Sequence, residues 1–154
     1  MNAVEEALNE YRIPDAWWPT PLINALQRID IALCIPWVAG SILDFLSSQQ
    51  HDHAAAISDG VHRAVAATSP DEIRKLLREY EATLHPDRDN ILVSYIHLVL
   101  GKQFLLGGNV TGLRTEIAWA LIFLGDCDFS RRTNVQFVVD NFLRLMPALP
   151  EKQG

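Results

Sequence analysis

Two helices, with the signals that begin and end them, are encoded in one stretch, residues 69–108: SPDEIRKLLREYEATLHPDRDNILVSYIHLVLGKQFLLGG. Its first four residues, Ser69-Pro-Asp-Glu72, supply an N-cap serine, a first-turn proline and a glutamate that can reach back to the cap. Apolar residues then recur at helical spacing as far as Leu84. Pro86 ends this helix, because the residue before a proline is disfavoured in helical geometry.

The second helix of the stretch is unusually apolar. Asp87 or Asp89 is expected to cap it, and Gly107-Gly108 is expected to end it. Between Ile91 and Leu100 apolar side chains occupy nearly every face of the helix. The pattern predicts burial on several sides, as in the central helix of a bundle.

Helical patterns continue on both sides of this stretch, and no segment alternates apolar and polar residues as a half-buried strand would. Pro36 is expected either to kink the second helix or to begin a third. The expected helices begin near Asn2 (ending at Pro14) and cover about 21–33, 36–48, 54–67, 111–125 and 130–146, with a polar joint at 49–54. The sequence therefore predicts an all-α fold, a single domain over residues 1–154, built as one compact bundle of six to eight helices around a central apolar helix.

The charge balance excludes one class of function. The 154 residues include 13 Lys and Arg against 19 Asp and Glu, a formal net charge of −6. A protein that grips nucleic acid through its phosphates is normally basic, so no direct nucleic-acid partner is expected. The acidity is concentrated in residues 1–69, which carry three basic and eight acidic side chains. This half is expected to attract a basic protein partner.

The sequence also bears on compartment. Met1-Asn-Ala-Val-Glu-Glu lacks the basic start and apolar run of a signal peptide. The longest uncharged apolar stretch, Ile31 to Leu43, has 13 residues, whereas a membrane span needs roughly 20. The two cysteines, Cys34 and Cys127, lie in or beside apolar segments and are expected to be buried reduced thiols. We therefore expect a cytoplasmic protein that does not enter the membrane.

One group of side chains suits a metal ion. His51-Asp-His53 lies in the polar joint, and Asp59 and His62 follow closely. Imidazoles and carboxylates are ligands of zinc and of other divalent metals, and catalytic sites often use three protein ligands. His51, His53 and His62 are therefore candidate ligands of a metal-dependent helical enzyme.

A second group, His85-Pro86-Asp87, follows a helix that carries Arg74, Lys75 and Arg78. This local pattern resembles the second helix and loop of J-domain co-chaperones. The resemblance covers about 20 residues and implies that the loop would stimulate an Hsp70 partner. The same residues also serve as an ordinary helix end, with a stop at Pro86 and a new cap at Asp87.

Three further features are candidate binding, core or helix-dipole residues. Trp17-Trp18 lies between prolines, where paired tryptophans suit an interface or a lid over the core. His97 lies on the most apolar helix and is expected to be a core histidine bonded to a main-chain carbonyl. Glu116 is expected to favour the dipole of its own helix.

No set of catalytic residues is complete in this sequence, so the leading hypothesis is a binding protein. The chain is similar in size and charge to bacterial immunity proteins and antitoxins, small acidic inhibitors of basic toxins. By this hypothesis it neutralises a basic partner protein and needs no cofactor. The expected contact residues are Asp15, Trp17, Trp18, Asp52 and Asp59. The surplus of apolar helix surface also admits a homo-oligomer.

Overall fold

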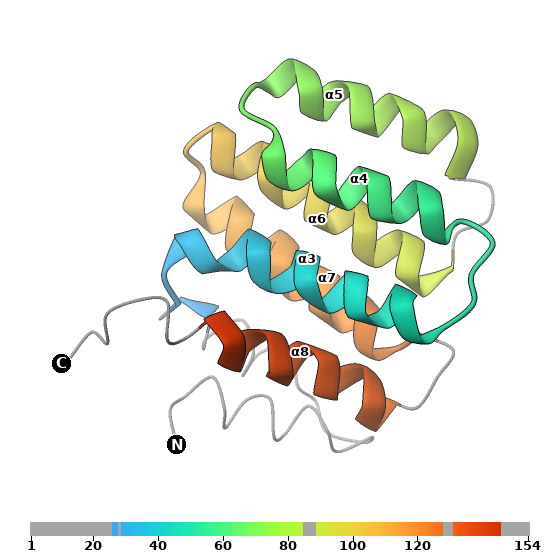
Figure 1. Cartoon of the computed structure of the whole chain (residues 1–154). Coiled ribbons are helices and arrows are strands. Elements are labelled where there is room, and N and C mark those ends of the chain that lie inside the picture. Colours follow the sequence, from blue (N-terminus) through green and yellow to red (C-terminus); the bar gives the residue numbers. More distant parts are fainter. Residues whose placement is uncertain (1–25, 28, 85–88, 128–130, 146–154) are drawn as a thin grey trace, which may run out of the picture.

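The computed structural model describes residues 26–27, 29–84, 89–127 and 131–145. Within these ranges lie six α-helices and one turn of π-helix, and no strand, which confirms the expected all-α bundle. Labelled as in Figure 1, the elements are α3 (Ile31–Ser48), α4 (Ala54–Ala66), α5 (Pro70–Glu79), η1 (Tyr80–Leu84), α6 (Asn90–Leu106), α7 (Val110–Gly125) and α8 (Arg131–Leu145).

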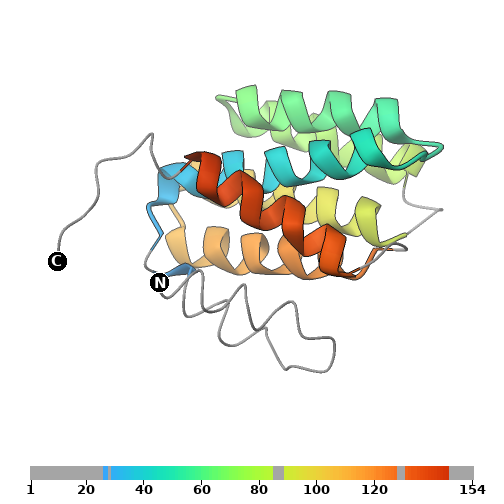
Figure 2. The same ribbon diagram turned by 60° about the horizontal axis from the view of Figure 1, so that its bottom comes forward.

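The helices pack in two layers. In Figure 1, α5, α4, α3 and α8 follow one another from top to bottom, and α6 and α7 lie behind them. Figure 2 shows α8 at the front of the bundle, with α7 below it. Each of the neighbours in the front layer is in contact with the next, and α7 contacts α3, α6 and α8.

The apolar helix that the sequence predicts at the centre of the bundle is α6. It packs against α3, α4, α5 and α7, as many helices as α3 contacts and more than α4, α5, α7 or α8 contacts. Burial on several sides follows from this position, and its buried residues are Ile91, Leu92, Ser94, Tyr95, Leu98, Val99 and Gly101. The sequence prediction of a central apolar helix is therefore confirmed.

Local cap signals are confirmed at three helix ends. The Ser69 hydroxyl accepts a hydrogen bond from the amide of Glu72 at the start of α5. Asp89 caps α6 by accepting from the amide of Leu92 at 3.0 Å. After α6, Gly108 has φ of 74°, a left-handed conformation that favours glycine. The expected start of the next helix at Thr111 is slightly wrong, because Asn109 caps α7.

The expected helix from 21 to 33 is wrong at its end. Asp30 accepts a hydrogen bond from the amide of Ala32 at 2.9 Å and thereby begins a new helix, α3. That helix continues through Pro36 to Ser48. Of the two alternatives for Pro36, the start of a new helix is excluded, because the side chain of Asp30 supplies the cap five residues earlier.

The 13-residue uncharged stretch Ile31 to Leu43 lies within a longer helix, α3, which also includes Asp44. With 18 residues and a mean hydropathy of 1.6, α3 is the one helix of the described ranges that could span a membrane by length and composition. Half of this window is buried inside the bundle, where α3 contacts α4, α6, α7 and α8. The core helix of a soluble protein meets the same test, so α3 is only weak evidence for a membrane span.

Both cysteines are buried thiols, as expected. Cys34 lies in the first turn of α3, and Cys127 follows the end of α7. Burial raises the pKa of the Cys34 thiol from 9.0 to about 11, because the thiolate would lose its hydration there.

Candidate functional site

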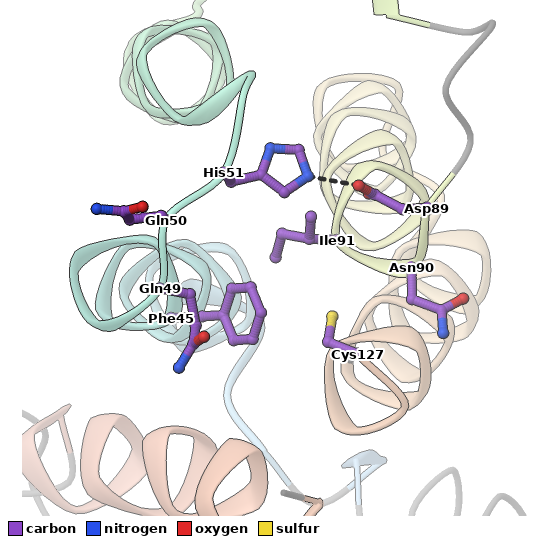
Figure 3. A pocket seen from close by; sticks show the side chains of 8 residues that line it. All are labelled: Phe45, Gln49, Gln50, His51, Asp89, Asn90, Ile91 and Cys127. Carbon is purple, nitrogen blue, oxygen red and sulfur yellow. Dashed lines mark hydrogen bonds and ion pairs between the residues drawn. The ribbon is translucent and has the colours of Figure 1, made fainter. Parts of the chain in front are cut away.

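A cavity of about 340 Å³ opens at the end of the bundle where α3 ends, α6 begins and α7 ends (Figure 3). Phe45 and Ile91 give it apolar walls and are almost fully buried. Amide side chains and three groups of greater chemical reactivity complete the lining: Gln49, Gln50, Asn90, His51, Asp89 and Cys127. A concave site with an apolar body and a few polar groups is the usual form of a binding pocket.

His51 is held in one orientation by both of its ring nitrogens. Nδ1 accepts a hydrogen bond from the main-chain N–H of His53 at 3.0 Å. Because that N–H can only donate, Nδ1 carries no proton, and the ring proton lies on Nε2. Nε2 then donates to the carboxylate of Asp89, as the dashed line in Figure 3 shows. Both ring nitrogens of His51 are therefore engaged, and neither is free to act as a base.

Asp89 joins the cavity to the helix behind it. One carboxylate oxygen, Oδ1, caps α6, and the other, Oδ2, accepts from His51. Its side chain is 41% exposed, so the negative charge also reaches solvent. The sequence predicts a cap on α6 from Asp87 or Asp89, and Asp89 supplies it. The pairing of Asp89 with His51 is not predictable from the sequence, because the two residues are 38 positions apart and no local signal links them.

The thiol of Cys127 contributes packing more than reactivity. Sγ donates to the carbonyl oxygen of Phe123 one turn earlier, at 3.4 Å. A nucleophilic cysteine needs a base that can take its proton. The histidine in this cavity has both ring nitrogens engaged. The arrangement therefore supports binding better than nucleophilic catalysis.

The three candidate metal ligands do not come together. The rings of His51 and His53 are 5.9 Å apart between centroids. His62 lies nine residues beyond His53 along α4, about 13 Å by helical rise, and its Nδ1 bonds the carbonyl of Ser58 at 2.8 Å. Across the described ranges there is no group of three or more His, Cys, Asp or Glu side chains placed to hold a metal.

The candidate partner-binding residues divide into two sets. Asp52, in the joint, and Asp59, on α4, are both exposed. Asp59 also pairs with Arg63 at 3.3 Å, so part of its charge is compensated. Asp15, Trp17 and Trp18 lie outside the described residues, as does His85-Pro86-Asp87.

His97 is paired differently from the sequence expectation. Its Nδ1 bonds the carboxylate of Glu116 on α7 at 2.5 Å, and no main-chain carbonyl takes that place. The ring stacks on Phe123, with centroids 5.6 Å apart, and faces Trp119, which is 41% exposed. The expectation of a carbonyl-bonded core histidine is wrong because the neighbouring helix offers a half-buried carboxylate.

The fold and the site define this chain as an all-α bundle with a cavity at one end, and the carboxylate of Asp89 lines that cavity. The chain matches no protein-family model, no curated protein and no solved structure. Residue roles therefore come from the geometry of this chain alone.

Proposed function

We propose that this chain is a non-enzymatic binding domain, a small acidic inhibitor of the immunity-protein or antitoxin type, that neutralises a basic partner protein. The observation that carries the proposal is the character of the end cavity. Within the described ranges Asp89 is the one carboxylate that lines it, and no lysine or arginine lines it there. The Asp89 side chain is 41% exposed and is paired, among the residues that the structure describes, only with His51, so the cavity offers its negative charge to a basic side chain of the partner.

The surroundings of the cavity extend this acidic character. Asp52 is exposed next to His51, and Asp126 is exposed next to Cys127, so both flank lining residues. Acidic side chains beside a cavity with apolar walls raise the rate of encounter with an opposite charge. A side chain of the partner that enters such a pocket is the usual form of an interface hot spot.

The chemistry of the cavity agrees with binding. The imidazole of His51 is held in one orientation, and the carboxylate of Asp89 accepts from it and from α6. Gln49, Gln50 and Asn90 add amide groups that can bond a partner without a change of protonation. An inhibitor needs such groups, whereas an enzyme would need a base or nucleophile with a free atom.

The experiment begins with native mass spectrometry of the untagged chain purified from its own host. We expect a stoichiometric companion of basic isoelectric point that inhibits growth when expressed alone and not when co-expressed with this chain. The affinity should fall steeply with salt concentration, because the contact is electrostatic. A chain that carries no basic companion would contradict the proposal.

Charge reversal then locates the surface. Asp52→Lys should weaken binding of the companion about tenfold or more at low salt. Asp71→Lys is the matched control, because Asp71 is equally exposed but lies at the start of α5, at the opposite end of the bundle (Figure 1). Equal losses in the two variants would show that only net charge matters and that the end cavity is not the contact.

A further inference from the structure

A second cavity, of about 300 Å³, lies between α4 and the junction of α5 with η1. Among the described residues, it shares none of its lining with the end cavity. Its wall includes Tyr80 and Thr83 from the single π-helical turn of the described ranges. Such turns are rare and are found frequently at functional sites, because they redirect side chains at a cost in backbone regularity.

The hydroxyl of Tyr95 belongs to the lining of this cavity. The residue is only 2% exposed, and its hydroxyl lies against the backbone of Gly60, where a Cβ would be 2.0 Å from the oxygen. No described residue hydrogen-bonds this hydroxyl, and its oxygen is not fully enclosed, so it is open to a partner in the cavity. Burial raises the pKa of Tyr95 to about 12, so the group remains a neutral hydroxyl that can both donate and accept.

Two carboxylates stand at the same cavity and are fixed by one arginine. Nη1 of Arg63 bonds Oε2 of Glu79 at 2.7 Å and Oδ2 of Asp59 at 3.3 Å. The second oxygen of each carboxylate, Oε1 and Oδ1, has no hydrogen-bond partner within the described ranges. Two negative charges and one positive charge leave the group with a net charge of −1. The cavity therefore favours one additional cation.

We propose that this cavity binds the primary ammonium group of an aliphatic amine. An ammonium has three N–H donors and no acceptor. The cavity offers three oxygen acceptors without another partner, on Tyr95, Asp59 and Glu79. The apolar side chains of Ala56 and Leu76 lie beside them and suit the alkyl chain that carries the ammonium. The source is either a lysine side chain of another protein or a free alkylamine, and the inference does not depend on the function proposed above.

The first experiment uses n-butylamine, which is an ammonium ion at neutral pH and has the length of a lysine side chain. Amide resonances followed by two-dimensional NMR should shift at Gly60, Glu79 and Tyr95 with millimolar affinity. n-Butanol is the control, because it has the same chain without the charge. Equal shifts with n-butanol, or no shifts with n-butylamine, would overturn the proposal.

Variants of the full chain then test the acceptors. Tyr95→Phe keeps the packed ring and removes only the hydroxyl, and Glu79→Gln keeps the shape and removes the charge. Each should weaken n-butylamine binding about tenfold, since a hydrogen bond to a charged group is lost. Glu81→Gln, two residues further and outside the cavity, should leave the affinity within about twofold. Unchanged affinity in Glu79→Gln would also overturn the proposal.

A second probe distinguishes the two sources. Nα-acetyl-lysine methylamide presents the same ammonium on a peptide backbone. If it binds as well as n-butylamine, the cavity accepts a lysine side chain of a protein. If only n-butylamine binds, the site takes a free amine.

Discussion

The indole nitrogen of Trp37 donates a hydrogen bond to the main-chain carbonyl oxygen of Val138 at 2.7 Å, which joins α3 to α8. Trp37 is fully buried, and its ring tilts against Phe142 with centroids 5.3 Å apart. The two partners of the hydrogen bond are 101 residues apart in the sequence. This contact therefore fixes the position of the last described helix against the first.

Replacing this tryptophan should destabilise the bundle. Trp37→Phe removes the indole donor, leaves a small cavity and exposes no new surface, so we expect a loss of about 2–4 kcal/mol in the free energy of unfolding. Urea denaturation followed by circular dichroism measures it. Trp119→Phe is the matched control, because Trp119 is 41% exposed, and should cost less than about 1 kcal/mol. Similar losses in the two variants would contradict a special role for the hydrogen bond to Val138.

The sequence predicts helix ends correctly where a few neighbouring residues determine them. The cap at Ser69, the cap at Asp89 and the glycine stop at Gly108 each depend on a few neighbouring residues. The error after residue 21 has a local cause as well. Asp30 is a good N-cap and begins α3. The helical spacing of apolar residues continues past Asp30 to Leu33, so spacing alone predicts one continuous helix there. Periodicity finds the existence of helices better than their ends.

The candidate site was less accessible to sequence reasoning because its contacts are distant. His51 was identified as a candidate ligand, but its partner proved to be a capping carboxylate 38 residues away. The sequence gives no signal that links His97 to Glu116. The packing of α6 on α7 brings Nδ1 of His97 to 2.5 Å from Oε2 of Glu116. The Tyr95 hydroxyl gave no signal in the sequence, since its position depends on the absence of a side chain at Gly60.

The two roles of Asp89 can be separated by substitution. Asp89→Asn keeps one oxygen that can cap α6 but places an NH2 donor opposite Nε2 of His51, so it should cost about 1 kcal/mol. Asp89→Ala removes both hydrogen bonds, and the expected loss is about 2 kcal/mol, from the cap and from the unpaired donor on His51. Thermal and urea denaturation compare the two. Equal losses for Asn and Ala would show that the cap on α6 does not contribute to stability.

Two helical glycines should respond in opposite directions to alanine. At Gly60 a Cβ would lie 2.0 Å from the Tyr95 hydroxyl and 2.6 Å from its ring, so Gly60→Ala must displace a rigid side chain. We expect a net loss of about 1–2 kcal/mol despite the better helix propensity. At Gly101 the nearest atoms would be 3.5 Å away, an ordinary contact, so Gly101→Ala should gain about 0.5–1 kcal/mol. A gain in both variants would show that Tyr95 moves freely away from α4.

The stability of the bundle should fall at alkaline pH through Cys34. Its pKa is about 11 in the folded state, raised from 9.0 by burial. A folded pKa above the unfolded one gives stability that is complete below pH 9 and is lost as the pH rises through 11. Cys34→Ala removes this titration but also removes packing, so the variant should be less stable at pH 7. The difference between wild type and variant should then shrink by about 2 kcal/mol between pH 9 and 11. Urea denaturation at each pH measures that difference, and a constant value would mean that the thiol is not held neutral by burial.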